Sequence, residues 1–141
     1  MNVIPLEAAR RLRENREARL AIYLCSSSEN FETLLSFPFI NLKPVHSLAS
    51  LRKIILEMNP DLFIIYSDIE WADSITLVEM IHIFCDAPIL AIGKTKTSPS
   101  KMKQIFSAGA HDALYSPLNR DDLREALDVL LKFRQQLIES Y

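Results

Sequence analysis

The apolar residues of this chain fall into short continuous runs that alternate with segments of helical spacing. Three runs are nearly unbroken and rich in strand-forming residues, which predicts strands buried on both faces over 20–25, 61–67 and 89–92. Weaker signals predict strands over 40–45, where Pro44 indicates a sheet edge, and over 112–115. The strongest run, DLFIIYS, leads directly into a single carboxylate, Asp68.

Between these runs, apolar residues recur at spacings of three and four, which predicts amphipathic helices. The expected helices cover 29–37 behind a serine N-cap, 47–58 behind Ser47 or Ser50, 72–84, 98–108 ending at a left-handed Gly109, and 120–140 behind Asn119. Strands that alternate with helices predict an α/β fold with a doubly wound parallel sheet. We expect the five-stranded, flavodoxin-like form with strand order 2-1-3-4-5, whose functional edge lies at the ends of strands 1 and 3.

Two segments extend beyond this alternating pattern. Residues 1–19 predict an extra N-terminal helical extension, in which five arginines are interleaved with glutamates as on a solvated helix. Residues 20–141 predict the main domain, whose final helix is longer than a small sheet needs and stays apolar as far as Leu137.

Composition narrows the function classes. A chain of 141 residues that is 49% hydrophobic and 24% charged is typical of one folded soluble domain, and no run is long enough to cross a membrane. The N-terminus has no signal-peptide pattern, so we expect a cytoplasmic protein. The net charge of -2 comes with scattered basic residues, so we expect no nucleic acid and no membrane as a partner.

Scarce residue types exclude most cofactor sites. Glycine occurs only at Gly93 and Gly109, so neither a P-loop nor a dinucleotide fingerprint can be present. The histidines are isolated and no cysteine pair has ligand spacing, which argues against a zinc site. We therefore expect no cofactor and no metal.

Three stretches carry a resemblance to a known family. They are Pro60–Ile65, Pro88–Ile92 and Ala108–Pro117, and the last, AGAHDALYSP, matches a pattern Ala-Gly-Ala-x-Asp-x-Leu-x-Lys-Pro with one exception. Over roughly residues 20–135 the chain resembles a response-regulator receiver domain of two-component signalling. The resemblance implies an aspartate after strand 3 that accepts a phosphoryl group. It also implies two Mg²⁺-binding carboxylates after strand 1, a hydroxyl after strand 4, and an aromatic residue and a lysine at strand 5.

Every one of these functional positions has changed in this chain. The acidic pair falls on Ser26 and Ser27, the acceptor on Tyr66, the switch hydroxyl on Gly93, the aromatic partner on Ala113 and the lysine on Ser116. The resemblance therefore implies a degenerate pseudo-receiver without catalytic residues, which is not an enzyme.

Asp68 leaves two readings open. If strand 3 is longer by two residues, Asp68 replaces Tyr66 at the acceptor position on the same face of the sheet, and the chain is an atypical phosphoaccepting receiver. Otherwise Asp68 is a loop carboxylate. A further alternative is a small-ligand binder that uses the emptied pocket between Ser26, Ser67 and Gly93.

Two neighbours of this pocket also have two readings each. Cys25 is either a reactive thiol or a buried structural residue. Trp71 is either an exposed anchor for a partner or a side chain that packs over the vacated pocket.

The expected function is a phosphorylation-independent protein-protein interaction module in bacterial signal transduction, which binds a partner protein or an output domain. Receiver domains commonly use the surface of the helix 98–108, the strand 112–115 and the helix 120–140. Here the expected interaction surface comprises Trp71, Lys101, Gln104, Tyr115, Arg124 and Asp128. We expect a homodimer through this surface.

Overall fold

The chain folds around one parallel sheet of five strands. The computed structural model describes residues 18–27, 30–94 and 96–139, with side chains up to residue 132. The strands are β1 (Arg19–Leu24), β2 (Ile40–Val45), β3 (Leu62–Tyr66), β4 (Ile89–Lys94) and β5 (Asp112–Ser116), in the order β2-β1-β3-β4-β5. The predicted fold class and strand order are confirmed. The predicted N-terminal helix lies outside the described residues, apart from residues 18 and 19.

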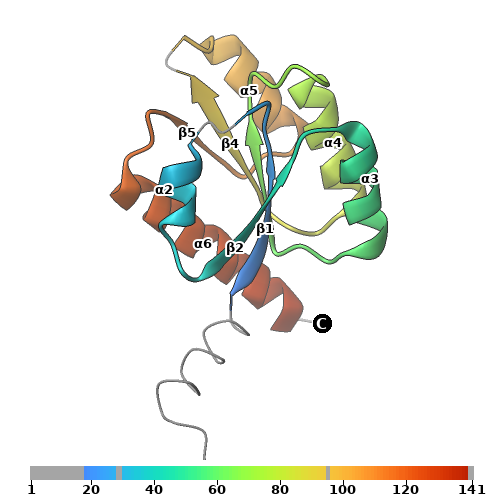
Figure 1. Cartoon of the computed structure of the whole chain (residues 1–141), viewed down its shortest axis with the longest axis vertical. Coiled ribbons are helices and arrows are strands. Elements are labelled where there is room, and N and C mark those ends of the chain that lie inside the picture. The colour runs from blue at the N-terminus through green and yellow to red at the C-terminus, as the bar shows by residue number, and fades with distance from the viewer. Residues whose placement is uncertain (1–17, 28–29, 95, 140–141) are drawn as a thin grey trace, which may run out of the picture.

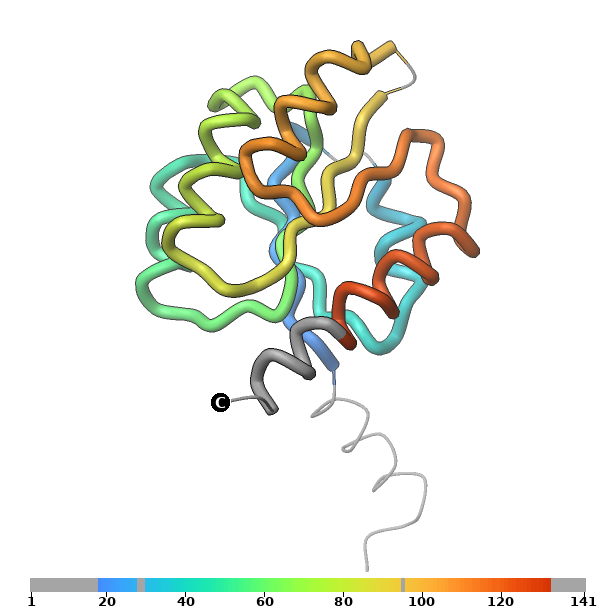
Figure 2. The backbone as a smooth tube through the Cα atoms, turned by 180° about the vertical axis from the view of Figure 1, so that it is seen from behind, coloured from blue at the N-terminus to red at the C-terminus, as the bar shows by residue number. Residues whose placement is uncertain are grey.

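Helices cover both faces of the sheet. They are α2 (Phe31–Leu35), α3 (Leu48–Glu57), α4 (Ser74–Phe84), α5 (Pro99–Ala108) and α6 (Arg120–Glu139). Helices α2 and α6 lie on one side, and α3, α4 and α5 on the other (Figure 1 and Figure 2). This double cover explains why β3 is apolar at every position, since all five of its residues are buried. Among the described residues, no helix is long and apolar enough to cross a membrane.

Polar side chains fix where most helices begin. The Ser47 side chain accepts a hydrogen bond from the Ser50 amide, and the Asn119 side chain accepts from the amides of Asp121 and Asp122 at 2.9 and 3.1 Å. The Asn119 cap was predicted, and Ser47 was one of the two caps predicted for its helix. The first helix differs from its prediction, because it starts at Phe31 rather than near residue 29 and no serine caps it.

The residue before that short helix is Asn30, which has a φ of 64° and makes no side-chain cap bond. Asparagine tolerates the left-handed region better than most residues do. The turn into α2 is therefore set by backbone conformation.

Strand β4 is longer than predicted, because it continues through Gly93 to Lys94 instead of ending at the glycine. Gly93 and Lys94 pair with Tyr115 and Ser116 of β5. A Cβ atom at Gly93 would lie 3.1 Å from the Met102 sulfur and 3.2 Å from the Tyr115 ring, so the glycine allows this close packing. The extra residue brings the Lys94 side chain to the edge where the candidate site lies.

Candidate functional site

The site lies where the parallel strands end, and Tyr66 occupies the last position of β3. Tyr66 pairs with Ile92 of β4, and the next amide, that of Ser67, still donates to the Ile92 carbonyl at 2.8 Å. The Tyr66 side chain is 3% exposed, and the Lys94 ammonium lies 5.8 Å from its ring centroid. A buried aromatic ring thus stands at the position that aligns with the family's acceptor.

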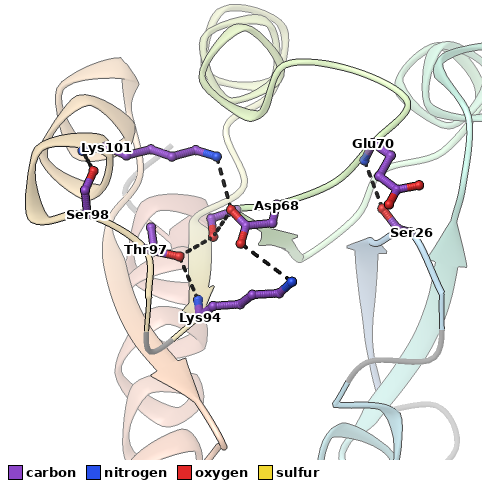
Figure 3. Close-up of polar contacts among 8 residues, drawn as sticks. Ser26, Asp68, Glu70, Lys94, Thr97, Ser98 and Lys101 are labelled. Carbon is purple, nitrogen blue, oxygen red and sulfur yellow. Dashed lines mark hydrogen bonds and ion pairs between the residues drawn. The ribbon is translucent and has the colours of Figure 1, made fainter.

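Asp68 lies in the turn that follows β3. The two-residue extension of the strand that would carry Asp68 into the acceptor position is absent, because β3 ends at Tyr66. Its carboxylate is instead turned toward β4 and α5. The Lys101 ammonium lies 3.2 Å from Asp68 Oδ1 and the Lys94 ammonium 3.9 Å from Oδ2 (Figure 3).

These contacts join three segments of the chain. The Asp68 side chain is 31% exposed, so each ion pair contributes about 0.2–1 kcal/mol rather than the larger value of a buried pair. The Ser67 hydroxyl also donates to Asp68 Oδ1 at 3.4 Å. Together the contacts hold the turn after β3 against the end of β4 and the first turns of α5.

Thr97, in the loop between β4 and α5, contacts both the end of β4 and the turn after β3. Its hydroxyl oxygen accepts from the Lys94 amide at 2.9 Å and lies 3.3 Å from the Ser67 hydroxyl. A hydroxyl is therefore present beside the end of β3, although the family's position for it holds Gly93. The hydroxyl comes from the loop rather than from the strand.

Sequence comparison did not identify this group of residues. It gave Asp68 no lysine partner, because the position after β5 holds Ser116, and it assigned Lys101 to an outer interaction surface. The available signal was topological: Lys94 follows a buried run whose strand lies beside β3, so both ends meet at one edge of the sheet. Asp68 therefore has two lysine partners, although the position aligned with the family's lysine holds Ser116.

At the end of β1, Ser26 and Ser27 occupy the positions of the family's acidic pair, and their surroundings differ. The Ser26 hydroxyl oxygen accepts from the Glu70 amide at 2.9 Å, and Ser27 is exposed. Figure 3 shows this contact on the other side of the edge from Asp68. Ser26 therefore ties the turn after β3 to the end of β1.

Trp71 and His46 both approach the carbonyl of Cys25 at the end of β1. Trp71 is partly buried, and its Nε1–H donates to that carbonyl at 2.9 Å. His46 Nδ1 lies 3.2 Å from the same oxygen and 3.7 Å from the fully buried Cys25 sulfur. No histidine is near Cys25 in sequence, but the pairing of Leu24 with Val45 brings the two residues together.

On the β5 side, the residues aligned with the family's switch and lysine make other contacts. The Ser116 hydroxyl donates to the Asn30 side-chain oxygen at 3.0 Å, which joins β5 to the start of α2. Ala113 pairs with Ala91, and the Tyr115 ring packs against Gly93. The family's hydroxyl and aromatic positions thus hold Gly93 and Ala113, and the ring beside Gly93 comes from Tyr115, two residues after Ala113.

Asp73 begins α4 as its N-cap. Its carboxylate accepts from the hydroxyl of Thr76 at 2.8 Å and from the amide of Thr76 at 3.3 Å. The hydroxyl bond is the main reason why the pKa of Asp73 lies below its usual value. The ionised carboxylate thus serves the helix start.

Comparison with solved structures identifies the fold. The signal receiver domain of a putative Luxo repressor protein from Vibrio parahaemolyticus superposes with a TM-score of 0.73 at 16% identity, over 87% of this chain and 98% of that one. A CheY-like receiver domain protein from Methanospirillum hungatei gives 0.73 at 14% identity, over 84% and 97%. The chain has the receiver-domain fold.

The same fold also forms part of longer proteins. NtrX from Brucella abortus matches with a TM-score of 0.76 at 14% identity, over 87% of this chain but 29% of NtrX. No family model matches the chain, and no curated protein matches it.

The Mg²⁺ site of receiver domains does not fit these residues. Across the described ranges, no group of three or more His, Cys, Asp and Glu side chains is placed to hold a metal ion. Ser26 and Ser27 supply no carboxylate, and Asp68 faces two ammonium groups instead of open coordination sites.

The residues predicted to line a small-ligand pocket all make contacts in this receiver fold. Ser26 bonds the Glu70 amide, Ser67 lies against Thr97, and the Tyr115 ring covers Gly93.

The residues of the predicted interaction surface are dispersed. Gln104, Arg124 and Asp128 are exposed, Tyr115 is 48% exposed, and Lys101 is turned toward Asp68. At about 100° per residue, Arg124 and Asp128 lie on the flank of α6 opposite to Asp122 and Val129, which lie beside β5. Their joint use as one surface stays a prediction.

Proposed function

We propose that this chain is a phosphorylation-independent, receiver-like interaction module in bacterial signal transduction, which binds a partner protein or output domain. The observation that carries the proposal is the buried Tyr66 ring at the acceptor position of a receiver fold. A phenol in that place cannot accept a phosphoryl group as a carboxylate does. The neutral Ser26 and Ser27 support the same conclusion, because they leave Mg²⁺ without its carboxylates.

The test is phosphorylation itself. The full chain is incubated with Mg²⁺ and acetyl phosphate, and its intact mass is recorded over time beside an active receiver domain treated in the same way. We expect the active domain to gain one phosphoryl group and this chain to gain none. A stable adduct that disappears in Asp68→Asn would overturn the proposal.

A second candidate is an atypical receiver that accepts the phosphoryl group on Asp68. The observation in its favour is the position of the Lys94 and Lys101 ammonium groups, which can neutralise phosphoryl oxygens. On this reading the adduct forms, is lost in Asp68→Asn, and forms about a hundredfold more slowly in Lys101→Met, since removing one preorganised donor typically costs about 10²–10³ in rate. Lys103→Met is the matched control, because Lys103 is an exposed lysine of the same helix.

A further inference from the structure

A groove with acidic walls runs between the outermost strand β5 and helix α6. Its volume is about 260 Å³. The lining residues are Asp112, Leu114, Asp122, Glu125, Ala126 and Val129.

The local structure explains how these side chains meet. Along β5 successive side chains alternate, so Asp112 and Leu114 face α6 while Tyr115 faces the other way and packs on Gly93. On α6 the lining positions 122, 125, 126 and 129 follow the i, i+3, i+4, i+7 spacing of one helical stripe. The groove therefore results from regular elements rather than from a loop.

The stripe borders the face that α6 buries in the core, and Ala126, which is 5% exposed, belongs to both. Leu123, Leu127 and Leu130 are 0 to 4% exposed and hold the helix on the sheet. Val129 is 60% exposed, and its side chain projects beside them into the groove. Burying this valine on a partner would remove more apolar surface from water than the isolated fold does.

The charges of the groove have one sign. Asp112, Asp122 and Glu125 are its titratable residues, and Leu114, Ala126 and Val129 form the apolar part of its lining. The next residue on the same stripe, Lys132, has the opposite charge, so the acidic stretch ends about one turn beyond Val129.

We propose that this groove binds a basic amphipathic segment of a partner protein. Lysine or arginine side chains of that segment pair with the groove carboxylates, and its apolar side chains contact Leu114 and Val129. Charge complementarity selects this occupant, and the groove has the size of a few side chains rather than of a globular face. The outer edge of β5 adds backbone groups that an extended segment can pair with.

This inference rests on the proposed interaction function and names the chemistry of the partner. The test uses NMR of the ¹⁵N-labelled full chain, titrated with a synthetic peptide of alternating lysine and leucine. Peptides of alternating glutamate and leucine, and of alternating lysine and serine, separate the contribution of charge from that of apolar contact. We expect the lysine–leucine peptide to shift amides of β5 and α6 around the groove, and the other two to bind at least about fivefold more weakly.

Matched variants locate the binding. Asp122→Asn with Glu125→Gln removes two groove charges, and we expect about fivefold weaker binding from two exposed ion pairs. Asp121→Asn with Asp128→Asn removes the same charge from exposed positions of α6 outside the groove and should leave the affinity nearly unchanged. An equal loss in both variants means non-specific attraction and overturns the proposal.

Two further outcomes also overturn it. One is the absence of groove shifts with the lysine–leucine peptide. The other is a shift of groove amides with protein concentration alone that Lys43→Glu with Lys53→Glu abolishes, because those lysines line a groove beside the opposite outer strand β2 and would identify a second copy as the occupant. The phosphorylation experiment is unaffected by either result, so the failure of this inference and that of the proposed function can be told apart.

Discussion

At the scale of single residues, both the backbone conformation and the surrounding space at position 109 require a glycine. It ends α5 with a φ of 134°, a backbone conformation that residues with a side chain rarely adopt. A Cβ atom there would lie 2.6 Å from His82 Cγ, so the space is also closed.

We therefore expect Gly109→Ala to lower the free energy of unfolding by about 2–3 kcal/mol, measured by urea denaturation followed by circular dichroism. His82→Ala combined with Gly109→Ala removes the contacts of the added Cβ with the His82 ring, leaves its 2.8 Å approach to the Cβ of residue 82, and leaves the strained φ. We expect the double variant to recover part of the loss. A single variant as stable as the natural chain contradicts the close contact between α4 and this turn.

The residues of the site show what sequence can predict at this scale. The losses at Ser26, Gly93 and Ser116 were evident, because each position is fixed by a neighbouring motif. The gains of Lys94 and Thr97 were not, because the end of β4 and the loop after it supply them at positions that the family's pattern does not specify. An alignment shows that a functional side chain is absent from its usual position. It does not show which residue of another segment takes its place, because that depends on tertiary packing.

At the scale of secondary-structure elements, β4 and β5 begin at a bridge that depends on protonation. The His111 amide donates to the Ile89 carbonyl at 2.9 Å, and the Ile89 amide donates to His111 Nδ1 at 3.0 Å. Nδ1 can accept only when it carries no proton. Burial lowers the pKa of His111 below its usual 6.5, and the nearby His82 adds to this.

A lowered histidine pKa means that the unfolded chain binds the proton more readily than the folded chain. The contribution of His111 to stability is therefore fully present above about pH 6.5 and falls as the pH drops from 6.5 toward the lowered pKa. We expect the free energy of unfolding to decrease between about pH 7.5 and about pH 5.5. His111→Asn, whose side-chain oxygen can accept from the Ile89 amide at any pH, should reduce this decrease. An unchanged decrease in that variant would show that other groups cause it.

Element types and order were predictable because β1, β3 and β4 are continuous apolar runs and most helices carry a clear cap. Element ends were less predictable. The predicted end of β4 at Gly93 was wrong, because this glycine continues the strand instead of ending it. Close packing against Tyr115 favours a residue without a side chain there. The start of α2 was wrong because Asn30 uses backbone conformation rather than a cap bond.

At the scale of the whole molecule, β5 is an outer strand with a different surface on each side. Toward α6 lies the acidic groove, which we assign to a basic partner. Toward α5 lie Tyr115, which is 48% exposed, and the exposed Gln104. Aromatic residues are enriched among interface residues that carry binding energy, so the α5 side suits an association between two copies.

The predicted homodimer can be tested on that side alone. We expect a dimer by light scattering coupled to size-exclusion chromatography, weakened about fivefold or more by Tyr115→Asp, since a hot-spot tyrosine contributes more than about 1 kcal/mol. The same measurement on Asp122→Asn with Glu125→Gln should give an unchanged dimer, because those residues line the opposite side of β5. A chain that stays monomeric at every concentration contradicts the prediction. If only the groove variant weakens the dimer, the two copies associate through the groove beside α6. The groove is then occupied in the dimer and cannot bind a basic partner.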